Sequence, residues 1–461
     1  MKNMTLERIT EVCGGVYYGS EADKKKEIAG AVIDSRQVES GYLFIAVKGE
    51  KVDGHQFIPQ VFEKGALAVL SEQELSEPAG PYIRVESTLG AMKKLAAYYR
   101  RSLDIKVVGI TGSVGKTSTK EMIASVLSQK YNVLKTEGNF NNEIGLPLTI
   151  FKIREQHEVA VLEMGISDFG EMHRLAEMAY PDICVITNIG LCHLENLLTR
   201  DGILKAKTES FEHLTPEGTA VLNGDDDKLS TKKEVNGKPV IFYGVGADSA
   251  FDIKKDIYAT DIENHGLEGM RAKIHTPQGD FDAQIPIPGE HNVYNALAGT
   301  AVGLQLGLSI REIAQGIASV QTIAGRTNLL HVKGMTVIDD CYNANPVSMK
   351  ASIDVLAHTS GRRIAVLGDM GELGAEEKEL HRSIGKVVAA SGIDALFCAG
   401  TLAEEYAREA KANPECEVHY KKTREEMTEE LLAYVKEGDT VLVKASHFME
   451  FPKVVEALTK E

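Results

Sequence analysis

From Ile105 onward the chain repeats one pattern, in which a short apolar run ends in Gly, Asn or Asp and a helical pattern follows. The first four runs are "IKVVGITG", "VAVLEMG", "DICVITNIG" and "TAVLNGD". Apolar runs that alternate with helices are typical of strands buried on both faces of a parallel sheet. The pattern therefore predicts an α/β fold whose central domain, residues 104–322, is a doubly wound and mostly parallel sheet.

Two flanking domains are predicted from the remaining sequence. Residues 1–103 contain short β-type runs, "GYLFIAVKG" and "ALAVLS", and a helical stretch, "STLGAMKKLAAYYRRSL", so a small α/β domain closed by a linking helix is expected. Alternating residues in 250–288 indicate an antiparallel annex to the central domain, and a helix is expected from about 291 to 306. After "AGRTN" the strand and helix alternation resumes, which predicts a Rossmann-like α/β domain over 323–461.

Composition excludes some classes of function. The 461 residues include 51 Lys and Arg against 67 Asp and Glu, a net charge of −16, which argues against nucleic acid or an anionic membrane as the main partner. The six cysteines show no C-x-x-C spacing, as expected of reduced thiols. No apolar run approaches the ~18 residues of a membrane span. We expect a soluble, cytoplasmic protein without membrane insertion, and a monomer.

The stretch "KVVGITGSVGKTSTKEM" places a glycine-rich turn between a strand and a helix. Backbone amides and the positive end of a helix attract phosphate oxygens, a lysine reaches the terminal phosphates, and the next hydroxyl holds Mg²⁺. The generic motif G-x-x-x-x-G-K-[ST] is incomplete because Ile110 stands at its first glycine, so an ordinary strand-to-helix turn is the alternative. We expect ATP to bind here, with Lys116 as a catalytic group, through Gly112, Ser113, Gly115, Lys116, Thr117 and Ser118.

Several stretches, in order, resemble the Mur ligases, which join amino acids to a muramyl nucleotide using ATP. They include "GITGSVGKTSTKEM", "GNFNNEIGLPLT", "AVLEMGIS", "NIGLCHLE", "KAKTESF", "PGEHNVYNALA", "GRTN", "IDDCYNANPVSMKAS" and "LGDMGELG". Two of them, "GNFNNEIGLP" and "DDCYNANPVSMKAS", are most similar to the family member that adds D-alanyl-D-alanine to UDP-N-acetylmuramoyl-tripeptide. The resemblance implies amide formation through an acyl phosphate, in the synthesis of peptidoglycan precursors.

Metal ligands are also implied. Glu163 ends the apolar run "VAVLE", where a carboxylate is costly unless it is paired or bound to a cation, so Glu163 and Thr117 are the candidate Mg²⁺ ligands. A lone histidine such as His193 is more often structural, but the resemblance places it at a second metal ion. By the same resemblance Lys207 is a carbamylated lysine that binds or orients metal. Lys116, His193 and Lys207 are therefore the catalytic candidates.

The resemblance also implies binding residues in all three predicted domains. Without it, most of these positions would be interpreted as surface turns. The candidates for the base and ribose of ATP are Asn292, Asn295, Arg326, Asp340, Tyr342 and Asn343. The candidates for the UDP-linked substrate and the dipeptide are Ser35, Arg36, Lys48 and Gly49, with Asp34 beside them, and Asn139, Asn142 and Lys444. Domain closure is expected to complete the ATP site.

One departure and two alternatives stay open. The family usually reads Lys-Gly-Ser-Arg near the C-terminus, whereas this chain has Lys444-Ala445-Ser446-His447. Within enzymes, the alternative is another Mur ligase or a ligase of the folylpolyglutamate synthase type. In a different class, the chain would be a regulatory protein that binds ATP without ligating anything. Whether the third residue of the tripeptide is lysine or diaminopimelate depends on the shape of the pocket.

Overall fold

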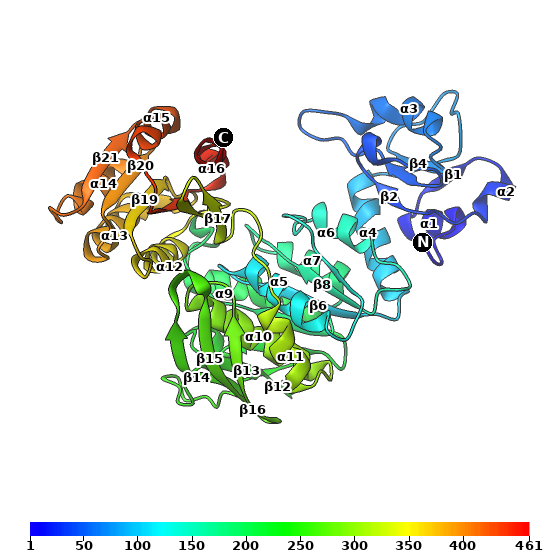
Figure 1. Ribbon diagram of the computed structural model, residues 1–461. Helices are drawn as coiled ribbons and strands as arrows, with labels where there is room; N and C mark the ends of the chain where they lie inside the picture. The colour runs from blue at the N-terminus through cyan, green and yellow to red at the C-terminus, as the bar shows by residue number, and fades with distance from the viewer. Residues whose placement is uncertain (461) are drawn as a thin grey trace.

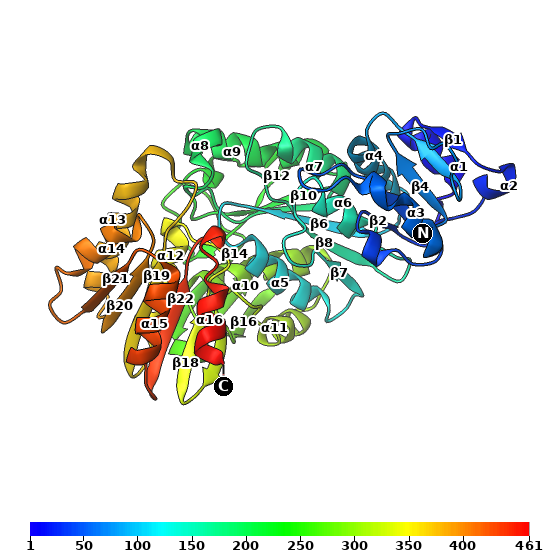
Figure 2. The same cartoon turned by 90° about the horizontal axis from the view of Figure 1, so that it is seen from above.

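The computed structural model describes residues 1–460, whose strands form three main sheets from three consecutive stretches of the chain. In Figures 1 and 2 the N-terminal and C-terminal stretches lie at opposite ends of the central one. The boundaries at residues 103 and 322 stay predictions. Among residues 1–460, no helix is both long and apolar enough to span a membrane.

The N-terminal sheet has the order β1-β5-β4-β3-β2, in which only β1 is antiparallel to its neighbour. Helices α1 and α4 pack on one face and α3 on the other. The linking helix predicted before residue 103 is α4. The bounds are β1 Val16–Tyr18, β2 Ala31–Val32, β3 Leu43–Ile45, β4 Ala68–Ser71, β5 Tyr82–Arg84, α1 Leu6–Cys13, α2 Glu21–Lys24, α3 Ile58–Glu63 and α4 Thr88–Arg101.

The central sheet has nine strands in the order β16-β15-β14-β13-β10-β9-β6-β8-β7. Strands β7 to β14 in this order are parallel, and β14, β15 and β16 are joined by antiparallel pairing, so the annex predicted for 250–288 extends this sheet. The strand bounds are β6 Lys106–Thr111, β7 Val133–Lys135, β8 Val159–Glu163, β9 Ile183–Ile186, β10 Thr219–Asn223, β13 Ile241–Val245, β14 Ile257–Asn264, β15 Met270–Thr276 and β16 Gly279–Ile285; β11 Glu234–Val235 and β12 Lys238–Pro239 form a separate hairpin.

Helices cover both faces of the central sheet, as the continuous apolar runs predict. In β6, Val107 packs with α4, α6, α7 and α9, whereas Val108 and Ile110 pack with α5, α10 and α11. Both sets are buried. The doubly wound prediction is therefore confirmed. The helix bounds are α5 Lys116–Leu127, α6 Gly145–Ile150, α7 Glu171–Ala179, α8 Leu194–Leu197, α9 Arg200–Thr208, α10 His291–Gln305 and α11 Ile310–Ala318.

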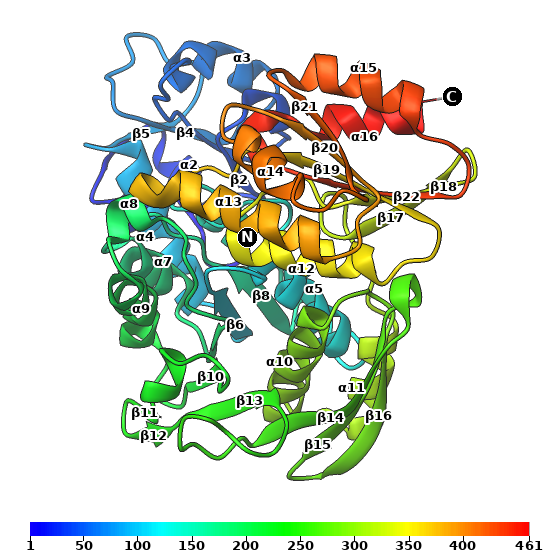
Figure 3. The same cartoon turned by 90° about the vertical axis from the view of Figure 1, so that its left-hand side faces the viewer.

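The third sheet has the order β17-β18-β22-β19-β20-β21, with β17 antiparallel at the edge and the other strands parallel. Helices α12, α13 and α14 pack on one face and α15 and α16 on the other, which is the predicted Rossmann-like arrangement (Figure 3). The bounds are β17 Asn328–Val332, β18 Met335–Asp339, β19 Arg362–Gly368, β20 Ala395–Ala399, β21 Glu417–Lys421, β22 Asp439–Lys444, α12 Pro346–Ala357, α13 Glu377–Ala390, α14 Ala403–Ala410, α15 Arg424–Tyr434 and α16 Pro452–Thr459.

Helix α4 packs against both the N-terminal stretch and the central stretch. Its buried residues pack against the N-terminal sheet and also against α6 and α7 of the central stretch, within one continuous apolar cluster. The hydroxyl of Tyr99 donates to the Ile153 carbonyl at 2.7 Å, and Arg100 donates to the Ala179 carbonyl at 3.0 Å. The two apolar cores of the third sheet are built from buried residues beyond 336. Leu267, which belongs to the central stretch, packs against one of them.

Candidate active site

The glycine-rich turn connects β6 to α5 in a conformation that needs its glycines. Gly112 has φ +150°, and a Cβ built there would lie 1.9 Å from Thr187 Oγ1. Gly115 is the N-cap of α5 and has φ +84°. Both positions favour a residue without a Cβ. The backbone amides that follow open the helix N-terminus, where phosphate oxygens bind favourably.

Asn188, which follows β9, holds this turn in place. Its Oδ1 accepts from the Val114 amide at 3.0 Å, and its Nδ2 donates to the Val114 carbonyl at 3.0 Å. The hydroxyl of Thr187 donates to the same carbonyl at 2.6 Å. Lys116 Nζ lies over the turn, where it donates to the Gly112 carbonyl at 3.0 Å. A turn fixed by a neighbouring strand end presents its amides in a constant geometry, as phosphate binding requires.

Glu163, at the end of β8, is the most deeply buried carboxylate of the site, with 2% of its surface exposed. Its Oε2 accepts from Thr117 Oγ1 at 3.0 Å, and its Oε1 accepts from Asn141 Nδ2 at 2.8 Å. Lys120 Nζ lies 3.9 Å from Oε2 but donates to the Thr136 carbonyl at 2.7 Å. A carboxylate and a hydroxyl beside the phosphate loop supply the hard oxygen donors that Mg²⁺ prefers.

The donor set of Thr117 and Glu163 fits the expected Mg²⁺ ion. Both side chains are buried and offer oxygen atoms, and the carboxylate supplies the negative charge that balances a divalent cation.

Lys207, on α9, is buried with 1% of its surface exposed. Among the residues described, no carboxylate oxygen lies within 4.0 Å of its Nζ, so its charge is not offset by an ion pair. Burial lowers the pKa of Lys207 to about 8, and the nearby Lys116 contributes to the same shift. Lys205, two residues earlier, is exposed and lies over the Phe169 ring at 5.9 Å. The two lysines therefore differ sharply in chemical environment.

A cleft lies between the central and third stretches, beside the phosphate loop. Of the predicted ATP residues, Gly115, Ser118, Asn295, Arg326 and Asp340 line it. The guanidinium of Arg326 stacks 4.2 Å from the centre of the Tyr342 ring, so Tyr342 supports Arg326. Further lining residues that the sequence did not indicate are Thr187, Tyr243, His291, Tyr294, Thr327 and residues of α12, namely Val347, Ser348, Ala351 and Ser352.

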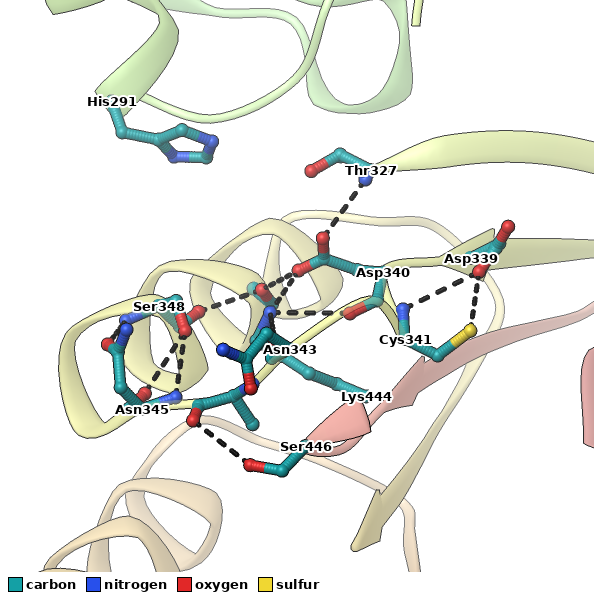
Figure 4. Close-up of polar contacts among 12 residues, drawn as sticks. His291, Thr327, Asp339, Asp340, Cys341, Asn343, Asn345, Ser348, Lys444 and Ser446 are labelled. Carbon is teal, nitrogen blue, oxygen red and sulfur yellow. Dashed lines mark hydrogen bonds and ion pairs between the residues drawn. The ribbon is translucent and has the colours of Figure 1, made fainter. Parts of the chain in front are cut away.

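Lys444, a substrate-binding candidate from the sequence, forms an ion pair beside the first cleft. Its ammonium is buried and lies 2.6 Å from Asp340 Oδ2, within the lining of this cleft (Figure 4). Asp340 also accepts from the Thr327 amide at 3.1 Å. The pKa of Asp340 is lowered: burial opposes ionisation, but the charge and hydrogen bond of Lys444 outweigh it. This ion pair braces the third-sheet side of the cleft.

Asn292, a candidate for the base and ribose of ATP, bonds to neighbouring protein groups through both atoms of its amide. Its Nδ2 donates to the Pro288 carbonyl at 2.8 Å, and its Oδ1 accepts from Asn295 Nδ2 at 2.8 Å. Asn295 Oδ1 in turn accepts from Thr119 at 2.7 Å. Asn292 does not line the cleft, whereas its neighbour His291 does. Asn292 therefore positions Asn295 through their shared hydrogen bond.

A second cleft adjoins the phosphate loop on the side of His193. It is lined by Ser113, Lys116, His193, Asn343 and His447, together with residues of the loops after β9, β18, β19 and β22. His193 Nδ1 lies 2.8 Å from Glu372 Oε2, so a polar contact joins the central stretch to the third one here. The predicted catalytic groups Lys116 and His193 share this cleft.

In the turn "GNFNNE", the asparagine that bonds to Glu163 is Asn141, beside the two substrate candidates. Asn139 and Asn142 are exposed, and the Oδ1 of Asn142 accepts from the Gly145 amide at 2.8 Å to begin α6. Asn141 is buried and bonds to Glu163. The sequence carries no signal that separates these three neighbours, because each is a common turn residue.

The N-terminal candidates lie together on the loop after β2 and the turn after β3. Arg36 is exposed and bonds to Asp34 at 2.7 to 3.1 Å, and Asp34 caps the short turn of 3₁₀ helix at 35–37. The side chain of Asp34 has its pKa lowered to about 2 by Arg36. Ser35 is buried, and Lys48 and Gly49 are exposed. They lie outside both clefts beside the phosphate loop.

Comparisons with known proteins cover the three stretches separately and the chain as a whole. The chain matches "Mur ligase family, catalytic domain" over 27–100, "Mur ligase middle domain" over 110–303 and "Mur ligase, glutamate ligase domain" over 325–447. It is 38% identical over 470 residues to the UDP-N-acetylmuramoyl-tripeptide--D-alanyl-D-alanine ligase of Bacillus subtilis (strain 168), with 99% of each chain covered. The chain belongs to the Mur ligase family.

Solved Mur ligase structures match the fold along almost the whole chain. The MurF crystal structure from Acinetobacter baumannii is 32% identical, covers 99% of each chain and has a TM-score of 0.89. The MurF ligase from Thermotoga maritima in complex with ADP is 32% identical, covers 94% of this chain and 97% of that one, and has a TM-score of 0.80. The expected three-domain Mur ligase fold is therefore confirmed.

His447 occupies the position at which the sequence resemblance leads us to expect an arginine. Its ring centre lies 5.7 Å from that of Tyr342, and it lines the cleft that also holds Lys116 and His193. An imidazole is shorter than a guanidinium and offers at most two donors. This Mur ligase therefore presents a smaller polar group at that wall of the cleft.

Proposed function

We propose that this Mur ligase joins D-alanyl-D-alanine to UDP-N-acetylmuramoyl-tripeptide with consumption of ATP, in the synthesis of peptidoglycan precursors. The observation that carries the proposal is the Thr117 and Glu163 pair, 3.0 Å apart at the end of the phosphate loop. The chain also matches the UDP-N-acetylmuramoyl-tripeptide--D-alanyl-D-alanine ligase of Bacillus subtilis over 99% of its length. A carboxylate beside bound phosphates can hold the metal ion that neutralises charge during phosphoryl transfer.

The proposed reaction has two steps. A carboxylate oxygen of the tripeptide attacks the terminal phosphorus of ATP, which forms an acyl phosphate and releases ADP. The amine of D-alanyl-D-alanine then attacks the acyl carbon, the tetrahedral intermediate expels phosphate, and the amide remains after the amine loses a proton. The protein contributes alignment and charge placement in both steps.

The residues beside the phosphate loop take specific parts in this proposal. Lys116 and the amides after Gly115 hold the terminal phosphates, while Thr117 and Glu163 hold Mg²⁺, which neutralises phosphate charge when bound. A second Mg²⁺ ion is proposed beside His193. The cleft lined by Arg326 and Asp340 takes the base and ribose of ATP.

Lys207 is proposed to be carbamylated by carbon dioxide. Only the neutral amine attacks carbon dioxide, and a lysine with a pKa of about 8 is roughly one-tenth neutral at pH 7. An ordinary lysine, with a pKa of about 10.4, is far less reactive. The resulting carbamate carries a negative charge toward the metal side of the site, in place of an unpaired buried cation.

The remaining assignments follow from the same proposal. The N-terminal loop with Ser35, Arg36, Lys48 and Gly49 binds the UDP group of the substrate, and an acidic protein needs such local cations for a diphosphate. Because two of the three substrates, ATP and the UDP-linked tripeptide, carry nucleotide phosphates made inside the cell, the proposed location is the cytoplasm. The proposed state is a monomer.

The test is phosphate release by the purified protein with Mg-ATP, UDP-N-acetylmuramoyl-tripeptide and D-alanyl-D-alanine, with one component omitted at a time. Release that requires all three, with a pentapeptide product identified by mass, is the expected result. Tripeptides ending in lysine or diaminopimelate are compared in parallel. ATP binding without phosphate release, also with other amino acids and folate as acceptors, would overturn the proposal and favour a regulatory ATP-binding protein.

A further inference from the structure

Two histidines and a glutamate converge on the surface of the central stretch, away from the phosphate loop. His173 lies on α7, and Glu212 and His213 lie on the 3₁₀ helix Glu209–His213 that follows α9. His173 Nδ1 is 2.7 Å from Glu212 Oε2 and 3.3 Å from His213 Nε2. One ligand atom from each residue lies within 4.8 Å of the others.

These three groups match the preferences of a zinc-like ion. Zinc is bound by imidazole nitrogen at 2.0–2.1 Å and by carboxylate oxygen at about 2.0–2.2 Å. His173 and Glu212 are about half exposed, so small rotations of their side chains can bring the three ligand atoms to these distances. Mg²⁺ prefers oxygen ligands and does not compete well for two imidazoles. Water completes the coordination of such an exposed site.

The backbone around the three residues is fixed by a neighbouring carboxylate. Glu209 accepts from the Gly170 amide at 3.1 Å and from the His173 amide at 3.2 Å, which ties the 3₁₀ helix to the first turn of α7. The two imidazole rings meet edge to face with their centres 4.5 Å apart. The ligands therefore approach one another before any ion binds, which reduces the cost of ordering them.

We propose that His173, Glu212 and His213 form a binding site for a zinc-class transition-metal ion, separate from the Mg²⁺ site beside Glu163. The bound ion links α7 to the 3₁₀ helix that directly continues α9. Because α9 carries Lys207, the ion stabilises the segment that positions this lysine. The site is independent of which amino acid or nucleotide the ligase accepts.

The first experiment measures binding of Zn²⁺ to the full-length protein in excess Mg²⁺, by competition with a chromophoric chelator. One ion per chain is expected, and His173→Ala and His213→Ala are each expected to weaken binding on the order of 100-fold. His265→Ala is the matched control, because its imidazole is similarly exposed and lies 3.1 Å from a single carboxylate, Glu263. Unchanged binding in His173→Ala, or no binding by the unaltered chain, would overturn the proposal.

Cys192 and His193 are adjacent and could offer Zn²⁺ a different site, so the second experiment identifies the ligands. Co²⁺ bound to cysteine gives a strong sulfur-to-metal charge-transfer band, whereas Co²⁺ bound to imidazole and carboxylate does not. We expect no such band, and we expect Zn²⁺ to raise the Tm of the unaltered protein and of His265→Ala but not of His213→Ala. A thiolate band that is lost in Cys192→Ser would contradict the proposal.

Discussion

Lys207 shows at the residue scale how burial changes the chemistry of a side chain. In the unfolded chain its pKa is near 10.5, and in the folded chain it is about 8, because burial disfavours the charged ammonium. Between these two values the unfolded chain holds a proton that the folded chain has lost. By linkage, the stability of the protein rises with pH over this window, and the cost of burying the charge is fully present below about pH 8.

We predict that Lys207→Met is more stable than the unaltered protein at pH 7, on the order of 3 kcal/mol, because the neutral side chain avoids the cost of a buried charge. This difference shrinks as pH rises from 8 toward 10.5. Urea unfolding in buffer free of carbon dioxide, at several pH values, measures it. A difference that does not depend on pH would show that Lys207 titrates normally.

The same substitution has an opposite effect on turnover. Lys207→Met is expected to lower kcat by a factor of at least about 100, because the proposed carbamate cannot form. Lys205→Met, on the exposed side of α9, is the matched control and keeps its rate within about twofold. Equal losses in the two variants would contradict the role given to Lys207.

A prediction about Asn141 distinguishes the site residue seen in the structure from the one expected from the sequence. Asn141→Ala removes the donor to Glu163 Oε1, leaves part of a buried carboxylate unsatisfied, and is expected to lower kcat about 10- to 100-fold. Asn139→Ala, at an exposed position of the same turn, tests the sequence-based assignment. Steady-state kinetics of both variants decide between them, and a larger loss in Asn139→Ala would favour the assignment made from sequence.

At the scale of elements, the apolar runs predicted the positions of the strands and the domain to which each strand belongs. They could do so because strands buried on both faces have a continuous apolar pattern. The helix over 88–101 and the helix starting at His291 follow equally from their periodicity. Strands of two or three residues, such as β1 and β2, are too short to carry a pattern. The order of strands in each sheet depends on contacts between distant segments, which periodicity does not encode.

Helix α4 is the element whose anchoring we expect to matter most for stability. Arg100 is buried and bonds to the Ala179 and Tyr180 carbonyls and to Asp182. Arg100→Ala is predicted to destabilise the protein by about 3 kcal/mol, because it leaves these acceptors without a buried donor.

Arg101→Ala is the control for this helix, since Arg101 points to the surface and stacks on Tyr180 at 4.9 Å. Its expected cost is below about 1 kcal/mol. The shift of the urea midpoint measures both variants. A loss in Arg101→Ala as large as that in Arg100→Ala would mean that the buried bonds of Arg100 do not anchor the helix.

At the scale of the whole molecule, the sequence located the phosphate loop and its neighbouring strand ends but not the pairs that join distant segments. Lys444 and Asp340 are 104 residues apart, and each looks like an independent binding residue until the fold brings them to 2.6 Å. His193 and Glu372 meet across two stretches in the same way. Such pairs follow from the packing of the sheets, which no local motif contains.

The cores of the molecule predict which fragments fold. The third sheet is covered on both faces by its own helices, so residues 323–461 are expected to fold alone, with cooperative urea unfolding. Residues 104–322 lack α4 and would expose the faces of α6 and α7, so this fragment is expected to aggregate, whereas 1–322 stays soluble. Size-exclusion chromatography distinguishes these outcomes, and a monomeric, folded 104–322 fragment would contradict the shared core.

Helix α4 also limits recombination between relatives of this ligase. A crossover at residue 103 takes α4 from one parent and α6 and α7 from the other. The side chains of these helices pack together but have not evolved together, so their shapes match only by chance. Within residues 1–460, a crossover near residue 322 cuts no apolar cluster apart from the contact of Leu267. Viable chimaeras are therefore expected to inherit the first two stretches together and to exchange the third freely.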